Sequence, residues 1–101
     1  MTELAQITES LLKAVDEVNQ GLPANKRVPR EQHAVLFGMH AEVDSLVLIN
    51  LVIVAERTIE SDFGRTISLA DERALLEEKS PFRSISSMAD YVAKLLREES
   101  N

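Results

Sequence analysis

The stretch Leu46–Ala55 constrains the fold most, because nine of its ten residues are apolar and Asn50 is the exception. Neither glycine nor proline occurs from Leu46 to Glu60, and either Asp44 or Ser45 can cap a helix that begins here. The stretch lacks the period-two alternation of a half-buried strand, so we predict a helix over 46–60. One buried stripe needs fewer apolar residues than this. Part of the helix surface is therefore covered by another element or forms an apolar docking face.

Two other segments, 3–19 and 84–98, have apolar residues at the three- and four-residue steps of amphipathic helices. The first has Thr2 as a candidate N-cap and is expected to end at Gly21 in the left-handed conformation. A further helix is predicted over Leu69–Lys79, with Pro81 ending it. The chain is therefore expected to be all-α.

The connections between these helices differ in length. Residues 20–32 hold two prolines and one glycine and predict a long ordered loop. Residues 34–39 are mostly apolar and predict a single turn packed on the core. The helix over 46–60 is expected to break at Ser61, with Gly64 as the stop. Together these features predict a small four-helix up-down bundle with a long first loop.

The composition limits the partners and the compartment. The 101 residues suffice for one domain, which we place at 1–101. The net charge of −6 disfavours nucleic acids and anionic membranes and favours basic proteins or neutral ligands, and the basic residues at 26, 27 and 30 are expected to form a solvated loop. No cysteine is present, and Met1–Ser10 lacks the pattern of a signal peptide. Leu46–Ala55 is too short to span a bilayer, so we expect a cytoplasmic protein.

Residues that could carry catalysis are not arranged to do so. His33 and His40 lie seven residues apart with Gly38 between them and no third ligand at a matching spacing, so no metal site is predicted. The sequence has no glycine-rich phosphate loop and no Gly-x-Ser-x-Gly motif. The acidic pairs Glu77-Glu78 and Glu98-Glu99 are expected on exposed helical turns. We therefore predict no catalytic residue and no enzymatic activity.

The tripeptide Asp44-Ser45-Leu46 stands at the start of the apolar helix, directly after the long loop. Ala55-Glu56 follows in the same helix, and Phe63-Gly64-Arg65-Thr66-Ile67 follows its end. A third segment, 80–92, has Ser84 where a serine or threonine can cap the last helix. In these features the chain resembles the acyl carrier protein family, including peptidyl carrier domains. The resemblance spans 3–97 in helix order and is specific from Asp44 to Val92.

The resemblance implies a free-standing, monomeric carrier of fatty acid, polyketide or nonribosomal peptide biosynthesis. Ser45 would receive 4′-phosphopantetheine from coenzyme A through a phosphopantetheinyl transferase, whose metal would lie near Asp44. Acyl or aminoacyl groups, loaded by a ligase or transferase, would then be held as thioesters on this arm. A helix N-terminus favours the phosphodiester, and because no base lies near Ser45 in the sequence, the transferase must supply the catalytic groups. The predicted docking residues for partner enzymes are Leu46, Val47, Ile49, Ile53 and Glu56.

The chain also departs from the family pattern. Ala41-Glu42-Val43 replaces the usual Leu-Gly-x run, and Val47 and Asn50 occupy places that are acidic in fatty acid carriers. Extra sequence after Ile67 implies an extended third helix. For Ile49 and Ile53, packing in the core remains as plausible as contact with partners. An alternative function is a helical adaptor that binds a partner through the apolar face of the helix over 46–60.

Overall fold

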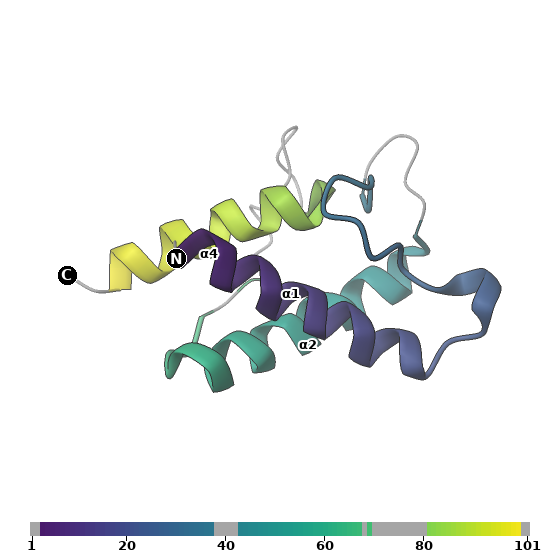
Figure 1. Cartoon of the computed structure of the whole chain (residues 1–101), viewed down its shortest axis with the longest axis horizontal. Coiled ribbons are helices and arrows are strands. Elements are labelled where there is room, and N and C mark those ends of the chain that lie inside the picture. Colours follow the sequence, from purple (N-terminus) through teal and green to yellow (C-terminus); the bar gives the residue numbers. More distant parts are fainter. Residues whose placement is uncertain (1–2, 38–42, 68, 70–80, 100–101) are drawn as a thin grey trace.

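The computed structural model of the chain describes residues 3–37, 43–67, 69 and 81–99. Within these ranges the elements are helical and no strand occurs (Figure 1). The radius of gyration, 12.8 Å, is close to the value of about 13 Å for a compact chain of 100 residues. The prediction of an all-α chain is confirmed for this part of the molecule.

The predicted helix over Leu69–Lys79 and the cap Thr2 lie outside the described residues, apart from Leu69 itself. The elements are α1 (Glu3–Gln20), η1 (Ala24–Lys26), α2 (Ser45–Phe63), η2 (Pro81–Arg83) and α4 (Ile85–Glu99).

Helix α1 forms over nearly the predicted range and buries the stripe Ile7, Leu11, Ala14 and Val15. Its predicted end was wrong in detail, because Gly21 does not adopt the left-handed conformation. The N–H of Gly21 instead donates to the Val18 carbonyl at 3.2 Å. A hydrogen bond from an N–H group to the carbonyl three residues earlier is of the 3₁₀ type. Such bonds tighten the last turn of a helix and satisfy its carbonyl groups without a positive φ.

The loop after α1 is held by side chains, as the prediction of an ordered loop requires. The Asn19 amide donates to the Val28 carbonyl at 3.0 Å, and its oxygen accepts the Val28 N–H at 2.7 Å. Val28 is buried in the core. This pair of hydrogen bonds fixes the loop about a third of the way from α1 to α2.

The predicted single turn over 34–39 is not observed in the part that the structure describes. The chain turns earlier, where the Ala34 N–H donates to the Glu31 carbonyl at 3.2 Å, and residues 34–37 are not helical. The Leu36 N–H donates to the Arg83 carbonyl at 2.6 Å, and Leu36 is buried as expected. A backbone bond to η2 therefore replaces the bonds that a helical turn would have made. Residues 38 and 39 lie outside the described part.

Helix α2 continues to Phe63, three residues past the predicted end at Glu60. Asp62 in its last turn binds Ser10 and Lys13 of α1, and Arg57 pairs with Glu17 at 3.4 Å. These pairs show that α1 and α2 are antiparallel. Contacts with α1 therefore stabilise a last turn whose sequence predicted a break. Gly64 ends the helix as predicted, with a φ of 69° and its N–H donating to the Glu60 carbonyl at 2.9 Å.

Replacing Gly64 by alanine is expected to lower the free energy of unfolding by about 1 kcal/mol, because a β-carbon disfavours the left-handed conformation. No heavy atom lies within 4 Å of the position of that β-carbon, so the alanine side chain would not clash with a neighbour. The substitution therefore tests backbone strain alone. Urea denaturation measures the difference. The control is Gly21→Ala, whose backbone lacks a positive φ and which should be neutral or slightly stabilising. Equal effects of the two substitutions would contradict this explanation.

Helix α4 begins at Ile85, directly after the serine that was predicted to cap it. The Ser84 hydroxyl accepts the Ser87 N–H at 3.1 Å, and the Ser87 hydroxyl accepts the Ser84 N–H at 3.0 Å. This reciprocal pair is a capping box in which serine takes the place of the usual glutamate. The N–H of Ser86 also donates to the Gln32 carbonyl at 2.8 Å, which ties the long loop to the start of α4.

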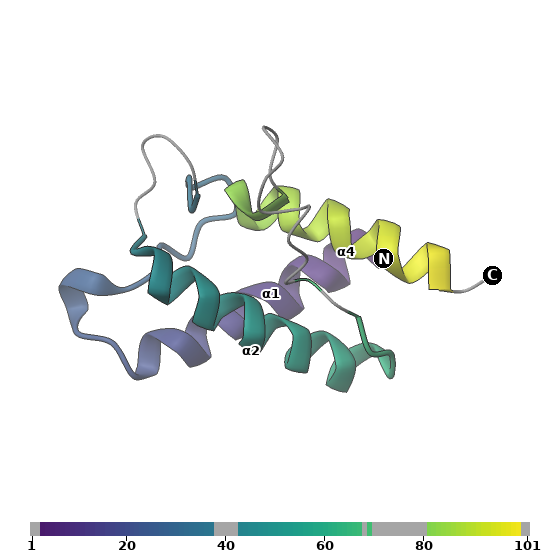
Figure 2. The same cartoon turned by 180° about the vertical axis from the view of Figure 1, so that it is seen from behind.

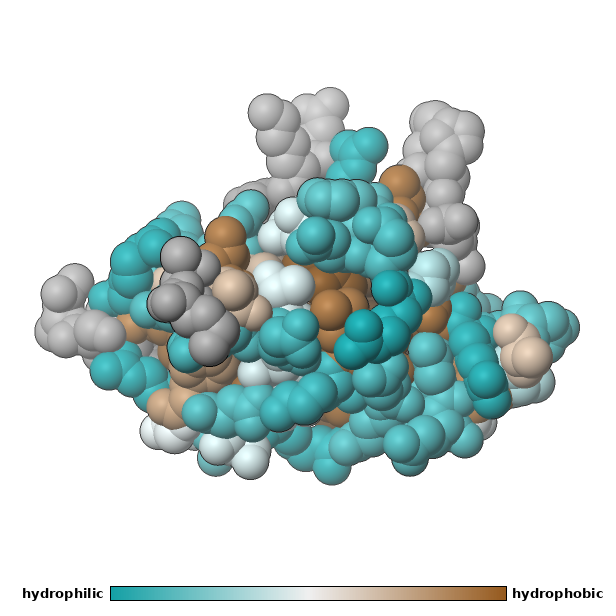
Figure 3. All heavy atoms as spheres, in the orientation of Figure 1, coloured by the Kyte–Doolittle hydropathy of each residue, from teal (hydrophilic) through white to brown (hydrophobic). Residues whose placement is uncertain are grey.

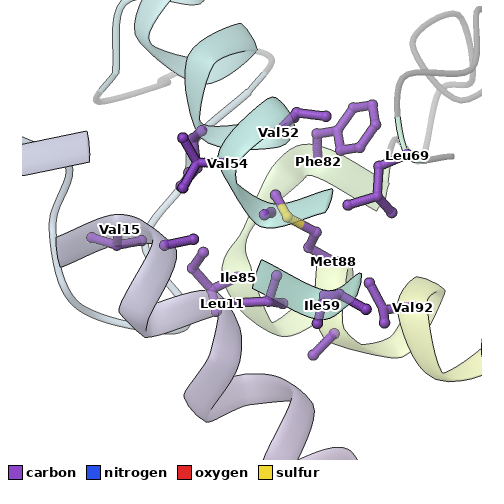
Figure 4. Packing of buried hydrophobic residues seen from close by; sticks show 14 of the residues in the cluster. Leu11, Val15, Val52, Val54, Ile59, Leu69, Phe82, Ile85, Met88 and Val92 are labelled. Carbon is purple, nitrogen blue, oxygen red and sulfur yellow. The ribbon is translucent and has the colours of Figure 1, made fainter. Parts of the chain in front are cut away.

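The core forms where α1 packs against both α2 and α4. Seen from behind, the segment after Gly64 passes between α2 and α4 (Figure 2). Leu69 from this segment lies with Phe82 of η2 and Met88 of α4 in the hydrophobic cluster (Figure 4). None of the helices in the described ranges is long and apolar enough to cross a membrane.

Candidate functional site

Helix α2 begins at Ser45, and Asp44 is its N-cap. The Asp44 backbone is extended, with φ −62° and ψ 140°, and its carboxylate accepts the Leu46 N–H at 2.8 Å. The Asp44 carbonyl accepts the first helical hydrogen bond, from Leu48 at 3.0 Å. Of the two candidate caps, Asp44 is therefore the one used, and Ser45 occupies the first helical position.

Three large apolar side chains of α2 face solvent. Leu46 is 73% exposed, Ile49 is 53% exposed and Ile53 is 49% exposed. Because an α-helix turns about 100° per residue, these positions lie within an arc of about 60° and form one row. We call this row the α2 stripe. The α2 stripe starts at the residue next to Ser45. The sequence left open whether Ile49 and Ile53 pack in the core, and the structure places both at the surface.

The other two predicted docking residues lie elsewhere. Val47 is 9% exposed and belongs to the hydrophobic core. Glu56 is half-buried, and its carboxylate accepts the Leu69 N–H at 2.9 Å. Glu56 thus fixes the segment that follows α2, whereas Val47 packs inside the molecule. Of the five predicted docking residues, only the three of the α2 stripe present an apolar side chain to solvent.

The surface of α2 changes character along its length. No charged residue occurs from Ser45 to Ala55, whereas the following turns carry Glu56, Arg57, Glu60 and Asp62. Arg57 is paired with Glu17 of α1. The first three turns of α2 therefore present apolar and uncharged polar groups to solvent. The face seen in Figure 3, by contrast, is mainly hydrophilic.

A polar cluster joins α1 to the far end of α2. The Ser10 hydroxyl, which is buried, donates to the Asp62 carboxylate, and Lys13 pairs with the same carboxylate oxygen at 2.8 Å. Grooves of about 320 and 540 Å³ lie on either side of the Lys13–Asp62 pair. The three groups satisfy one another, so the cluster acts as a clamp between the helices.

Asp62 accepts hydrogen bonds from Lys13 and from Ser10, and these bonds hold the pKa of its carboxyl below the ordinary value. The bond from Lys13 has the larger effect, and partial burial acts in the opposite direction. A lowered pKa in the folded state means that the stabilisation is present above the ordinary Asp pKa of about 3.9 and is lost as the pH falls below it. We therefore expect Asp62→Asn to cost up to about 1 kcal/mol at neutral pH and much less near pH 3. Urea denaturation at both pH values measures this.

The control for this experiment is Asp90→Asn, at an exposed position of α4. Surface substitutions of this kind usually change the free energy of unfolding by less than about 0.5 kcal/mol. A loss at Asp62→Asn that is equally large at both pH values would show that the side chain acts through packing instead of through its charge.

The sequence did not predict the clamp, because Ser10 and Asp62 are 52 residues apart. One local signal was present: Ser10 falls on the buried stripe of α1, three residues after Ile7. A serine at a core-facing position indicates a buried hydroxyl that needs a partner. The identity of that partner could not be read from the sequence.

The two histidines do not form a site that the structure describes. His33 is exposed, and His40 lies outside the described ranges, as do Glu77 and Glu78. In the part of the chain that is described, no three side chains of metal-binding type come together.

Comparison of the chain with protein-family models, with curated proteins and with solved structures finds no match. The candidate site is the start of α2, which consists of the cap Asp44, the first helical residue Ser45 and the α2 stripe.

Proposed function

We propose that the protein is an acyl or aminoacyl carrier that holds biosynthetic intermediates as thioesters on 4′-phosphopantetheine attached to Ser45. One observation carries the proposal: the serine of the Asp44-Ser45-Leu46 motif is the first residue of a 19-residue helix. The exit motif of the resemblance agrees with it, because Gly64 ends the same helix. In this proposal the protein is a cytoplasmic monomer, and residues 69–79 supply the third helix of a four-helix bundle.

The first helical position suits an attached phosphodiester. The N–H groups of the first helical turn have no partner within the helix, and the positive end of the helix dipole lies there. The Asp44 carboxylate accepts the hydrogen bond of one of these groups, the N–H of Leu46. A phosphate on Ser45 would lie next to the rest of this turn, as anions at helix N-termini do.

Ser45 is the acceptor in the attachment reaction and not a catalyst. Its hydroxyl oxygen would bond to the β-phosphorus of coenzyme A, the bond from that phosphorus to the bridging oxygen would break, and adenosine 3′,5′-bisphosphate would leave. The hydroxyl proton would pass to a base of the transferase, which also supplies Mg²⁺. Once attached, 4′-phosphopantetheine supplies a terminal thiol for the thioester. Tethering then keeps the cargo near each partner enzyme at high effective concentration.

The exposure of the α2 stripe also favours a second function, a helical adaptor that binds a partner through this face. The two functions differ in their need for Ser45. An adaptor would bind its partner unchanged after Ser45→Ala, whereas a carrier would lose its cargo.

Intact mass measurement tests the proposal. The protein is incubated with coenzyme A, Mg²⁺ and a broad-specificity phosphopantetheinyl transferase. The expected result is the gain of one phosphopantetheinyl group, which peptide fragmentation assigns to Ser45. An unchanged mass, with an established carrier modified in parallel, would overturn the carrier function.

A further inference from the structure

The last turn of α2, residues 60–63, has charges that are unfavourable at the C-terminal end of a helix. Its sequence, Glu60-Ser61-Asp62-Phe63, contains two acidic residues and no basic one. The dipole of a helix is negative at this end, so carboxylates destabilise the turn and cations stabilise it. Serine and aspartate are also weaker helix formers than alanine or leucine. By its own sequence this turn should be unstable, as the predicted break at Ser61 implies.

Few apolar contacts hold the last turn of α2 in place. Ile59, directly before it, is fully buried, whereas residues 60–62 are exposed. Phe63 packs against the core with a half-buried side chain. The chain is anchored again beyond Gly64, where Ile67 is buried. The turn therefore lies between two anchored positions, and it can open without unfolding either of them.

Lys13 of α1 supplies the cation that this turn lacks. Its ammonium group lies 2.8 Å from the Asp62 carboxylate. Two further carboxylates, those of Glu9 and Glu17, lie about one turn before and after Lys13 in α1 and line the grooves on either side of it. Arg57, the other cation that lines these grooves, is paired with Glu17. Loss of the Lys13 charge would therefore leave Asp62 unpaired near other carboxylates and at the negative end of the dipole.

We propose that the charge of Lys13 keeps the last turn of α2 closed, and that without this charge the turn opens while the rest of α2 stays folded. The part of the helix from Val47 to Ile59 does not follow, because its buried side chains belong to the core. Opening uncovers the hydroxyl of Ser10, which is buried and bonded to Asp62 in the closed form. The other end of the helix, which carries Ser45, is unchanged.

Amide hydrogen exchange of the full chain, followed by NMR, tests whether the turn opens separately. The Gly64 N–H donates to the Glu60 carbonyl at 2.9 Å and is protected only while the turn is closed. Relative to their intrinsic rates, the amides of Phe63 and Gly64 should exchange at least about tenfold faster than that of the fully buried Leu51. Urea below the unfolding transition should leave the rates at Phe63 and Gly64 unchanged, because a local opening exposes little surface.

Substitutions at the two charged positions test the role of the Lys13 charge. Lys13→Gln should raise the exchange rates of Phe63 and Gly64 at least about threefold, because it leaves a carboxylate unpaired at the negative end of the dipole. Asp62→Asn removes that carboxylate together with the ion pair and should raise these rates less. The double variant Lys13→Gln/Asp62→Asn should therefore exchange more slowly than Lys13→Gln alone. The control Lys94→Gln, at an exposed position of α4, should leave both rates within about twofold.

Three results would overturn the inference. Exchange at Phe63 and Gly64 that is as slow as at Leu51, or that rises as steeply with urea, shows that the turn unfolds only with the whole molecule. Unchanged rates in Lys13→Gln show that its charge does not hold the turn. A double variant that exchanges faster than Lys13→Gln shows that Asp62 stabilises the turn without its partner. None of these results involves Ser45, so the carrier function stands or falls separately.

Discussion

Replacing Ser45 by alanine is expected to abolish the mass gain from coenzyme A completely. The attachment reaction forms a bond to the side-chain oxygen of this residue, and alanine has no nucleophile to take its place. The fold should not change much, because Asp44 supplies the helix cap and alanine is the best helix former. Intact mass spectrometry of the variant, with circular dichroism to verify its helix content, measures both effects.

The matched control for this variant is Ser61→Ala. Ser61 is an exposed serine of the same helix, four turns further along, and its loss should leave the modification intact. If the Ser45→Ala protein still gained the phosphopantetheinyl group, the attachment site would lie on another hydroxyl. If neither variant nor the wild type gained mass, the adaptor function would become the better explanation of the exposed α2 stripe.

Replacing Phe82 by alanine is expected to lower the free energy of unfolding by about 3–5 kcal/mol. Phe82 is fully buried, and it lies with Leu69 and Met88 in the core (Figure 4). The substitution removes the transfer free energy of the ring and leaves a cavity that the surrounding side chains can fill only in part. The loss is a large fraction of the roughly 5–15 kcal/mol typical of a domain, so the urea concentration at the midpoint of unfolding should fall clearly. Urea denaturation followed by circular dichroism measures it.

Leu46→Ala is the control for the core prediction, since Leu46 is equally apolar but 73% exposed. Its cost should stay below about 0.5 kcal/mol, because little apolar area returns to water. A similar loss of stability in both variants would contradict the distinction between the core and the α2 stripe. A small loss at Leu46 also means that this position can be changed in docking experiments without unfolding the protein.

Features set by neighbouring residues were predictable from the sequence. The extent of α1 follows from its apolar spacing, and the left-handed Gly64 and the Ser84 cap follow from residue types that suit those positions. Gly21 shows the limit of this reasoning. A glycine permits a left-handed conformation but does not require one. Helix α1 ends instead with hydrogen bonds of the 3₁₀ type, from an N–H group to the carbonyl three residues earlier.

Features that depend on distant residues were not predictable in the same way. The last turn of α2 forms because Asp62 meets Ser10 and Lys13 of α1. The backbone at Leu36 bonds to Arg83, 47 residues away in the sequence, and no local pattern indicates that bond.

For the candidate site, the sequence by itself determined the motif, its position at the start of an apolar helix and the lack of charge over the first three turns. Only the tertiary structure decided which apolar residues of that helix reach solvent. A helix that is apolar on nearly every side carries no periodic signal of its orientation, so Val47, Ile49 and Ile53 look alike in the sequence. Packing against α1 and the rest of the core buries Val47 and leaves the two isoleucines exposed.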